Sequence, residues 1–331
     1  MWFRRLVGFH ENNPEQVREN LILEGEFITS RVNGKKMKCG TLMIPSLQEL
    51  RDEAQDLTSY GGQISIDEKV GDIQRIHLNN PGATFQAASQ FNLLEMASPE
   101  YTPEQGVDIY DNDHTQGPAC AIACGAGTIY RNYFVALEGQ TGQTRSRQVD
   151  CLAEIGSYFN NDQLSHWKME NGYAFATEKG LQYISTIIKQ LNEQEYEELE
   201  GKLRVGVQAN TEMTIDPDGG LVTQVYCSAL PIRYTDVATD KWEAFARLVL
   251  EATYEATFHA ALNNYAATGN NKLFLTLVGG GVFGNPMTWI LAAIEKSILK
   301  FKHTPLEVSI VSYGSSKPSV RRFLSELHGR I

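Results

Sequence analysis

The chain has 331 residues, of which 42% are hydrophobic and 21% are charged, a balance typical of a folded globular protein rather than a disordered one. Asp and Glu outnumber Lys and Arg by 40 to 29, and the net charge of −11 argues against nucleic acid as the main partner, because that affinity depends on basic side chains that neutralise phosphates. The sequence shows neither a run of about 18 apolar residues nor the apolar segment of a signal peptide, so we expect no membrane partner.

Residues 1–62 are predicted to form an N-terminal extension made of a β-hairpin and a helix. The segments 21–30 and 36–44 are rich in strand-forming residues, and an Asn-Gly pair, a strong hairpin-turn signal, lies between them. Ser46 is expected to cap a helix at residues 47–57, because a Glu occupies the third helical position and completes a capping box.

Residues 63–331 are predicted to form one α/β domain with a helical excursion near residues 150–200. A hairpin is expected from the two strand-like segments 203–213 and 221–230, which flank an Asp-Pro-Asp-Gly-Gly turn. The last third alternates helix and strand patterns, at residues 242–265, 273–278, 287–301 and 307–313. This alternation predicts parallel pairing with right-handed crossovers, and together with the hairpin it predicts a mixed sheet with helices on both faces. The first of these helices is expected to be amphipathic, with its Glu and Arg side chains on a solvent face.

The strongest local signal is the glycine-rich turn between the segments 273–278 and 287–301. It leaves the carboxyl end of a buried strand and enters a helix that Asn285 is expected to cap and Pro286 to open. Open α/β sheets bind ligands at this place, and glycines let backbone amides close around a phosphate. A tight turn that only lets strand and helix pack closely is the alternative. The predicted phosphate-binding residues are Gly279, Gly280, Gly281, Val282, Phe283, Gly284 and Asn285.

Polar side chains also follow the strand predicted near residues 83–88. Gln86, Ser89 and Gln90 offer donors and acceptors that suit ribose hydroxyls or the edge of a base. A capping or turn role for Ser89 and Asn92 is the alternative.

A second polar cluster precedes a segment of small residues at 117–127. A carboxylate and a histidine in such a loop can hold or deprotonate a water molecule, and a solvated loop explains them equally well. The cluster consists of Asp111, Asp113, His114 and Gln116.

The five cysteines are scattered and odd in number, which predicts reduced thiols in a cytoplasmic protein. Cys120 follows His114 by six residues, so a cysteine-dependent hydrolase is one interpretation. We expect a structural role instead, because the neighbours of Cys120 are small residues suited to close packing and no partner His and Asn are evident.

The order of these elements resembles that of macrodomains over residues 80–320. Gln86-Ala-Ala-Ser89 resembles the Asn-Ala-Ala-Asn that ends the ribose-facing strand of that family. Residues 117–127 stand where the first glycine-rich loop of the family precedes a helix, and Gln116 and Gly117 at the start of this stretch are predicted ligand-binding residues. Residues 279–284 resemble the second loop, which wraps the diphosphate and carries an aromatic residue, here Phe283, beside the distal ribose. Tyr313 is placed like the aromatic residue that packs near the ligand.

The resemblance implies a three-layer macrodomain-like α/β fold, with ADP-ribose or a related diphosphate nucleotide as ligand and no cofactor or metal. Three functions stay open: an enzyme that hydrolyses an ADP-ribosyl linkage, a non-catalytic ADP-ribose-binding module, and the cysteine hydrolase that uses Cys120 and His114. The expected partner is a small-molecule nucleotide or an ADP-ribosylated substrate, and the oligomeric state stays open. The candidate residues for holding the attacking water are Asn92, Glu95, Asp113 and His114.

Overall fold

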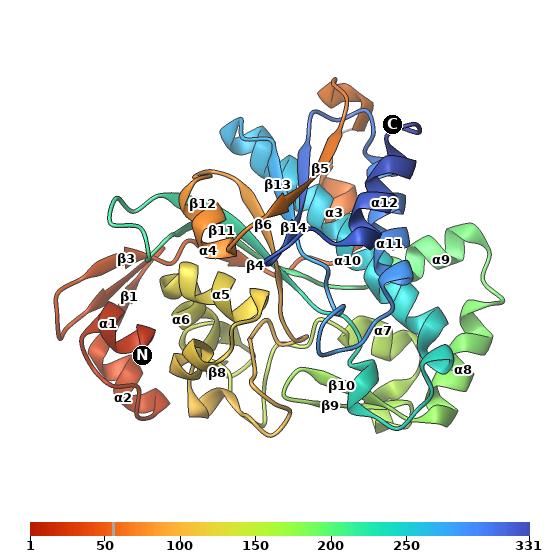
Figure 1. Cartoon of the computed structure of the whole chain (residues 1–331). Helices are drawn as coiled ribbons and strands as arrows, with labels where there is room; N and C mark the ends of the chain where they lie inside the picture. Colours follow the sequence, from red (N-terminus) through yellow and green to blue (C-terminus); the bar gives the residue numbers. More distant parts are fainter. Residues whose placement is uncertain (55–56) are drawn as a thin grey trace.

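The computed structural model describes residues 1–54 and 57–331. Its centre is a seven-stranded mixed sheet in the order β4-β11-β12-β6-β13-β14-β5 (Figure 1). β11 runs antiparallel to both of its neighbours, and the pairs from β12 to β5 are all parallel. The strands are β4 (Thr41–Met43), β5 (Ser65–Val70), β6 (Thr84–Ala88), β11 (Gly206–Glu212), β12 (Leu221–Cys227), β13 (Lys272–Leu275) and β14 (Glu307–Ser312).

Helices cover both faces of the sheet, which confirms the predicted three-layer α/β arrangement (Figure 1). One face carries α3 (Leu47–Glu53), α8 (Glu178–Ile188), α9 (Glu193–Glu200), α10 (Thr239–Thr268), α11 (Met287–Lys300) and α12 (Pro318–Leu327). The other carries α4 (Ile73–Leu78), α5 (Gln116–Ala123) and α6 (Gly125–Tyr133). The predicted parallel pairing of the strands on either side of α11 is confirmed by the register of β13 with β14, and the predicted hairpin is confirmed by β11 and β12.

The central helix α10 differs from its predicted amphipathic form. It packs against α3, α8, α9 and α11 as well as the sheet, so it is enclosed on most of its sides. Glu243 and Arg247 do form an exposed pair, with 2.8 Å between Oε1 and Nε. Glu255, which was expected on the same solvent face, is only 3% exposed. The i,i+4 pattern of charges therefore predicted the helix correctly but placed one carboxylate wrongly.

The N-terminal region is more elaborate than the predicted hairpin and helix. Segment 21–30, predicted as one strand of a hairpin, forms a two-stranded hairpin by itself. The Asn-Gly turn then connects its second strand to a third strand. The strand predicted at 36–44 is divided, and its second half, β4, pairs with β11 in the central sheet. The elements of this region are α1 (Trp2–Val7), α2 (Pro14–Asn20), β1 (Leu21–Glu24), β2 (Phe27–Ser30) and β3 (Lys36–Lys38). The domain boundary at residue 62 stays a prediction.

The predicted capping box at the start of α3 is confirmed, since the Ser46 hydroxyl accepts from the Glu49 amide and the Glu49 carboxylate accepts from the Ser46 amide. The helix ends at Glu53, short of the predicted residue 57, and residues 55–56 of that prediction lie outside the described residues.

The excursion near residues 150–200 contains helices as predicted, and a hairpin that was not predicted. Besides α8 and α9, the segment from residue 136 holds β7 (Ala136–Leu137), β8 (Gln140–Thr141), α7 (Ala153–Tyr158), β9 (Trp167–Glu170) and β10 (Tyr173–Ala176). Short 3₁₀ helices lie at η1 (Leu57–Tyr60), η2 (Pro103–Gln105), η3 (Asp108–Asn112), η4 (Asn161–Gln163) and η5 (Ile232–Tyr234).

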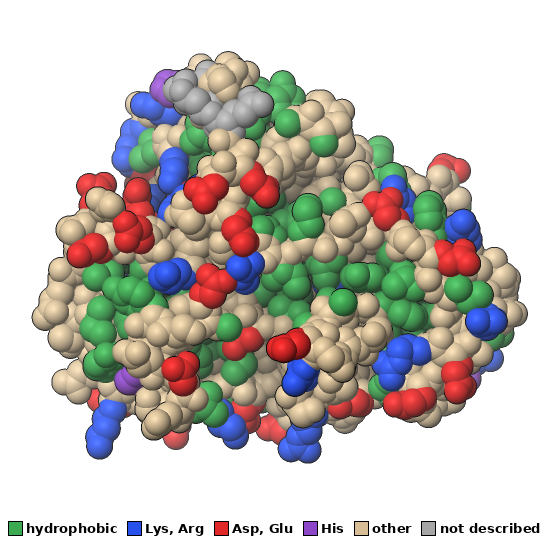
Figure 2. Space-filling view, turned by 180° about the vertical axis from the view of Figure 1, so that it is seen from behind, with side chains coloured by type: hydrophobic (Ala, Val, Ile, Leu, Met, Phe, Trp, Pro, Cys, Tyr) green, Lys and Arg blue, Asp and Glu red, His purple; other side chains and the backbone are tan. Residues whose placement is uncertain are grey.

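Within the described part of the chain, no helix has the length and apolar character needed to cross a membrane. On the face shown in Figure 2, Lys and Arg side chains lie among Asp and Glu side chains rather than in one broad basic patch.

Candidate functional site

A cleft with two lobes lies at the carboxyl ends of β6, β13 and β14. The larger lobe has a volume of about 510 Å³ and the smaller about 220 Å³. The two lobes meet at Gly281 of the glycine-rich turn, at Thr276 and Leu277 just after β13, and at Asp113 and Gln116 before and at the start of α5. Open α/β sheets place ligands at this edge, because the loops that follow parallel strands converge there.

The pairing between β6 and β13 stops short of the carboxyl ends of the two strands, beside the cleft. Their pairing is limited to Leu273 with Thr84 and Phe274 with Phe85. Beyond these pairs the Gln86 side chain fills the gap, since its Oε1 accepts from the Thr276 amide at 3.2 Å and its Nε2 donates to Thr257 Oγ1 at 3.0 Å.

Two predicted ligand-binding glutamines are therefore engaged in holding the strands. Gln86 is fully buried and lies outside both lobes, which corrects its predicted contact with a ligand. Gln116 lines both lobes, but its amide is bonded along β6, with Nε2 donating to the Gln86 carbonyl at 2.8 Å and Oε1 accepting from the Ala88 amide at 3.2 Å. Both polar atoms of the Gln116 side chain are thus hydrogen-bonded to the backbone of β6.

The glycine-rich turn is built around two positive backbone angles. Gly279 has φ 75° and Gly284 has φ 78°, a conformation that side chains with a Cβ rarely adopt. Internal hydrogen bonds close the turn from the Gly280 amide to Leu277, from the Gly284 amide to Gly281, and from the Asn285 amide to Gly279.

Three consecutive backbone amides of this turn take no part in these internal hydrogen bonds. Among the residues that the structure describes, the N–H groups of Gly281, Val282 and Phe283 donate to no acceptor. All three residues line the smaller lobe, and a Cβ built on Gly281 would meet no atom within 4 Å. Successive free amides in a turn form a concave seat for an anion. Three of the seven residues predicted to bind phosphate thus have free amides in the smaller lobe, and phosphate binding itself stays a prediction.

The end of the turn behaves differently from the prediction. Asn285 does not cap α11, whose N-cap residue is Pro286 without a side-chain hydrogen bond. The Asn285 Nδ2 instead donates to the Leu230 carbonyl at 2.9 Å, which ties the turn to the segment after β12. Gly284 packs against the Arg233 side chain. Neither Gly284 nor Asn285 lines a lobe, whereas Gly279 lines the smaller lobe and Gly280 the larger.

Glu95 is the most unusual side chain of the smaller lobe. It is 6% exposed, and among the described residues its Oε1 has no hydrogen-bond partner. Burial, with a contribution from the negative charge of Asp113, raises the pKa of Glu95 well above its ordinary value, although Arg131 acts in the opposite direction. Gly117 lies directly against this carboxyl and the Ala88 carbonyl, so a side chain at residue 117 would displace one of them.

The other predicted water-holding residues are distributed unequally. Asp113 lines both lobes, with Oδ1 accepting from the Thr115 amide at 2.8 Å, and His114 lines the larger lobe. Asn92 is fully buried and lies outside the cleft, because its Oδ1 accepts from the Leu94 amide at 3.1 Å and its Nδ2 donates to Gln148 at 2.8 Å. Asn92 therefore has the turn role that the sequence offered as the alternative to ligand contact.

Ser89 and Gln90 line the smaller lobe, and both also make local turn contacts. The Ser89 hydroxyl donates to the Gln90 carbonyl at 2.9 Å. The Gln90 Oε1 accepts from the Met96 amide at 2.6 Å, which folds the segment between them back on itself. Tyr313 lies at the rim of the larger lobe and is 76% exposed.

Sequence reasoning missed several residues of the cleft. Asp72 lines the larger lobe at the junction of β5 and α4, and the strand-to-helix turn at Gly71 was the signal that could have identified it. Lys317 lines the same lobe, on a turn that Glu68 holds by accepting from Ser312 Oγ and the Lys317 amide. Tyr173 enters the smaller lobe from the unpredicted hairpin β9–β10.

Aromatic rings close one side of the smaller lobe. The ring centre of Phe283 lies 5.4 Å from that of Tyr173 and 5.7 Å from that of Tyr234, and the two tyrosines are 5.2 Å apart. These rings come from strand β10, the 3₁₀ helix η5 and the glycine-rich turn, and they give the lobe an apolar wall.

Cys120 lies outside both lobes and is fully buried. Burial, followed by the nearby charge of Glu95, raises the pKa of its thiol well above the ordinary value. Since the thiolate is the nucleophilic form, this environment disfavours a cysteine nucleophile. The arrangement agrees with the predicted structural role and removes the geometric basis of the cysteine-hydrolase interpretation.

Fold and cleft together define an α/β protein with a ligand cleft at the carboxyl ends of its parallel strands. No family model matches the sequence, and no curated protein matches it. Among solved structures, poly(ADP-ribose) glycohydrolase from Deinococcus radiodurans in complex with ADP-ribose is similar at 11% identity, covering 88% of this chain and 95% of that chain with a TM-score of 0.45. Poly(ADP-ribose) glycohydrolase from Thermomonospora curvata bound to the inhibitor ADP-HPD is similar at 13% identity, covering 96% and 97% with a TM-score of 0.42.

Proposed function

We propose that the protein binds ADP-ribose, or a closely related diphosphate nucleotide, in this cleft and hydrolyses an ADP-ribosyl linkage there. The observation that carries the proposal is the row of three free amides at Gly281, Val282 and Phe283, beside the buried carboxyl of Glu95 in the same lobe. The amides supply hydrogen-bond donors for an anion without any basic side chain. A strongly acidic protein can therefore bind a phosphate at this place.

The position of the amides also supports a placement for the rest of the ligand. Gly281 lines both lobes, so an anion bound there has one lobe on either side. A ligand with a central diphosphate and a sugar on each end has this shape. The larger lobe would take the nucleoside, where the Asp72 carboxylate can accept a hydrogen bond from an exocyclic amino group and Tyr313 offers an aromatic face. The smaller lobe would take the distal ribose against Phe283.

The smaller lobe contains the two carboxyl groups that a glycosidic hydrolysis requires. Burial raises the pKa of Glu95 and so favours its protonated form, which would donate its proton to the leaving oxygen as the bond to the anomeric carbon breaks. Asp113 lines the same lobe and would accept a proton from the water whose oxygen attacks that carbon. The products are free ADP-ribose and the protonated leaving group, after which Glu95 regains a proton from solvent and Asp113 releases to solvent the proton that it took from the water.

Calorimetric titration of ADP-ribose into the wild type and Gly281→Glu tests the proposal. The variant places a negative side chain in the anion seat, and since Gly281 has free space and no positive φ, the fold should tolerate it. Hydrogen bonds to a charged group contribute about 1.5–3 kcal/mol each, so losing them should weaken binding by about 100-fold or more.

Gly329→Glu is the matched control, because it adds the same side chain at a glycine with open space that lines neither lobe. Its affinity should equal that of the wild type. Equal affinities for wild type and Gly281→Glu, or no binding of ADP-ribose by the folded wild type, would contradict the proposal. Binding without release of ADP-ribose from ADP-ribosylated peptides would leave a binding module in place of an enzyme.

A further inference from the structure

The wall of the cleft that carries Asp113 is attached to the N-terminal region of the chain. The preceding 3₁₀ helix η3 packs against α1, and Val107 and Tyr110 belong to a hydrophobic cluster of that region rather than to the main core. Figure 1 shows α1 and α2 beside α6 at one end of the molecule. Residues that are far from the cleft in sequence therefore support one of its sides.

Glu11 is the polar centre of this attachment. One of its carboxylate oxygens, Oε2, accepts from the Val107 amide at 2.8 Å and from the Asp108 amide at 2.6 Å. The other, Oε1, accepts from the Tyr133 hydroxyl at 2.6 Å. The carboxylate thus binds the amino end of η3 and α6 at once.

Further contacts fix the same peptide group from the N-terminal side. The Trp2 indole donates to the Val107 carbonyl at 3.0 Å, and the Phe3 amide donates to the Asp108 carboxylate at 3.1 Å. Gly106, with φ 89°, lies so close to the Glu11 carboxylate that a Cβ there would collide with it. The entry into η3 is held by side chains and backbone on all of these sides.

The other end of η3 reaches the cleft. The Tyr110 hydroxyl accepts from the backbone amide of Glu95 at 3.0 Å, and the Tyr110 ring lines the larger lobe. The Asp113 amide donates to the Tyr110 carbonyl at 3.2 Å. Tyr110 consequently contacts the backbone of both proposed catalytic residues, Glu95 and Asp113.

We propose that Glu11 is a positioning residue, which holds Glu95 and Asp113 in place through η3 and Tyr110. The inference rests on the proposed function for its consequence in catalysis, but the mechanical link from Glu11 to the Glu95 amide is a property of the fold alone. The N-terminal region is then a support for the cleft wall rather than a cover for the cleft.

Hydrogen exchange and kinetics on Glu11→Gln test the inference. Gln keeps the size but offers one acceptor oxygen to three donors, so the amide of Glu95 and those of residues 107–112 should lose protection by about 10-fold or more, while amides of β12 and β6 keep theirs. Because small misplacements of catalytic groups cost up to about 100-fold in rate, kcat for release of ADP-ribose should fall by about 10- to 100-fold. The dissociation constant for ADP-ribose should change by less than about threefold, since the amide seat lies on another loop.

Glu19→Gln is the control, because it removes the same charge from an exposed position of the same region. Its exchange and kinetics should match those of the wild type. Tyr133→Phe removes one donor to Glu11 and should show the same changes more weakly, which keeps the test open if Glu11→Gln fails to fold.

Two outcomes overturn the inference. One is unchanged protection of the Glu95 amide in both Glu11→Gln and Tyr133→Phe. The other, if the wild type is active, is a kcat of Glu11→Gln equal to that of the wild type. A wild type that binds no ADP-ribose overturns the proposed function instead, and the exchange measurement still decides whether Glu11 holds Glu95.

Discussion

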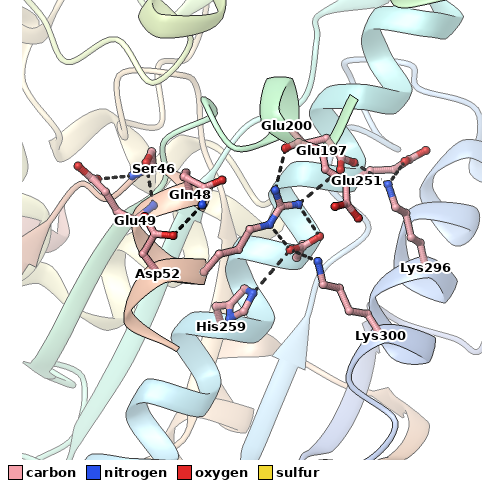
Figure 3. Close-up of polar contacts among 12 residues, drawn as sticks. Ser46, Gln48, Glu49, Asp52, Glu197, Glu200, Glu251, His259, Lys296 and Lys300 are labelled. Carbon is pink, nitrogen blue, oxygen red and sulfur yellow. Dashed lines mark hydrogen bonds and ion pairs between the residues drawn. The ribbon is translucent and has the colours of Figure 1, made fainter. Parts of the chain in front are cut away.

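The cleft and the helical junction on the opposite face of the sheet both bury carboxylates, but only the junction pairs them with cations. The junction is formed by α3, α9, α10 and α11 and consists of Arg51, Glu200, Glu251, Glu255, Lys296 and Lys300. Figure 3 shows Glu200, Glu251, Lys296 and Lys300 meeting from three of these helices. Three basic and three acidic side chains meet there, although burial raises the pKa of Glu200 to about 7 against the attraction of Lys296. In the cleft, Glu95 forms no ion pair with any residue that the structure describes, and Arg131 acts on it only from a greater distance.

The same residue type responds in opposite ways to these surroundings. At the junction, burial disfavours the charged form of Glu255, but His259 at 3.6 Å, Arg51 at 2.6 Å and Lys300 at 2.6 Å outweigh it and hold the pKa of Glu255 well below its ordinary value. In the cleft, burial prevails and raises the pKa of Glu95. Buried charges that are fully paired indicate a structural role, whereas a buried, unpaired and strongly perturbed carboxyl beside a cavity indicates chemistry.

The largest expected effect is that of Glu95→Gln on hydrolysis. Gln has no acidic proton, so the leaving oxygen loses its general acid, and the rate of ADP-ribose release should fall by about 100- to 10,000-fold. ADP-ribose affinity, measured by calorimetry, should remain within a few-fold because the amide seat is untouched. Glu100→Gln, at an exposed nearby carboxylate, serves as the control. A Glu95→Gln variant that keeps the wild-type rate would remove Glu95 from the mechanism.

Arg51→Met should produce the next largest effect, and it acts on stability rather than on binding. Arg51 is bonded to Glu255 through two nitrogens and lies 3.5 Å from Glu200, so its removal leaves buried carboxylates with less compensation. Breaking a buried ion pair on one side costs about 3–5 kcal/mol of unfolding free energy. Urea denaturation followed by circular dichroism measures this loss.

The comparison for that variant is Arg247→Met, which breaks the exposed pair with Glu243 and should cost less than about 1 kcal/mol. Folded Arg51→Met should bind ADP-ribose as the wild type does. Equal losses in the two variants would mean that the junction contributes no more than a surface pair, and the contrast with the cleft would fail.

The order of elements could be predicted from the sequence because each element carries its own local pattern. The capping box at Ser46, the Asp-Pro-Asp-Gly-Gly turn and the apolar spacing of α11 depend on neighbouring residues only. The glycine-rich turn was predictable for the same reason, since a glycine run after a buried strand is a local feature, whereas its role as a phosphate seat stays a proposal.

The errors concern side chains whose partners are distant in sequence. Glu255 has the spacing of a solvent-facing residue, and only the fold brings Arg51, 204 residues away, and Lys300 against it. Gln86 is a residue type that often contacts ligands, yet its amide is hydrogen-bonded to Thr276 after β13 and to Thr257 of α10, so it bridges structural elements instead. Tyr173 reached the smaller lobe from a hairpin that the sequence did not indicate. Such partners follow from tertiary packing, which no local pattern records.

The last prediction concerns how the free energy of unfolding of Glu95→Gln, relative to that of the wild type, depends on pH. Glu95 keeps its proton in the folded state well above the ordinary carboxyl pKa of 4.5, whereas in the unfolded chain it ionises near that value. At pH values between the two pKa values the folded state holds one more proton, so the free energy of unfolding falls as pH rises, by up to about 1.4 kcal/mol per pH unit. Below the unfolded pKa both states are protonated and this loss is absent.

Glu95→Gln has no proton to release, so its stability relative to the wild type should increase from pH 4.5 towards neutral pH. Urea denaturation of both proteins at pH 4.5, 5.5, 6.5 and 7.5 measures the difference. A difference that stays constant over this range would show that Glu95 is ionised in the folded protein, and the proton assigned to the leaving group would then have to come from elsewhere in the cleft.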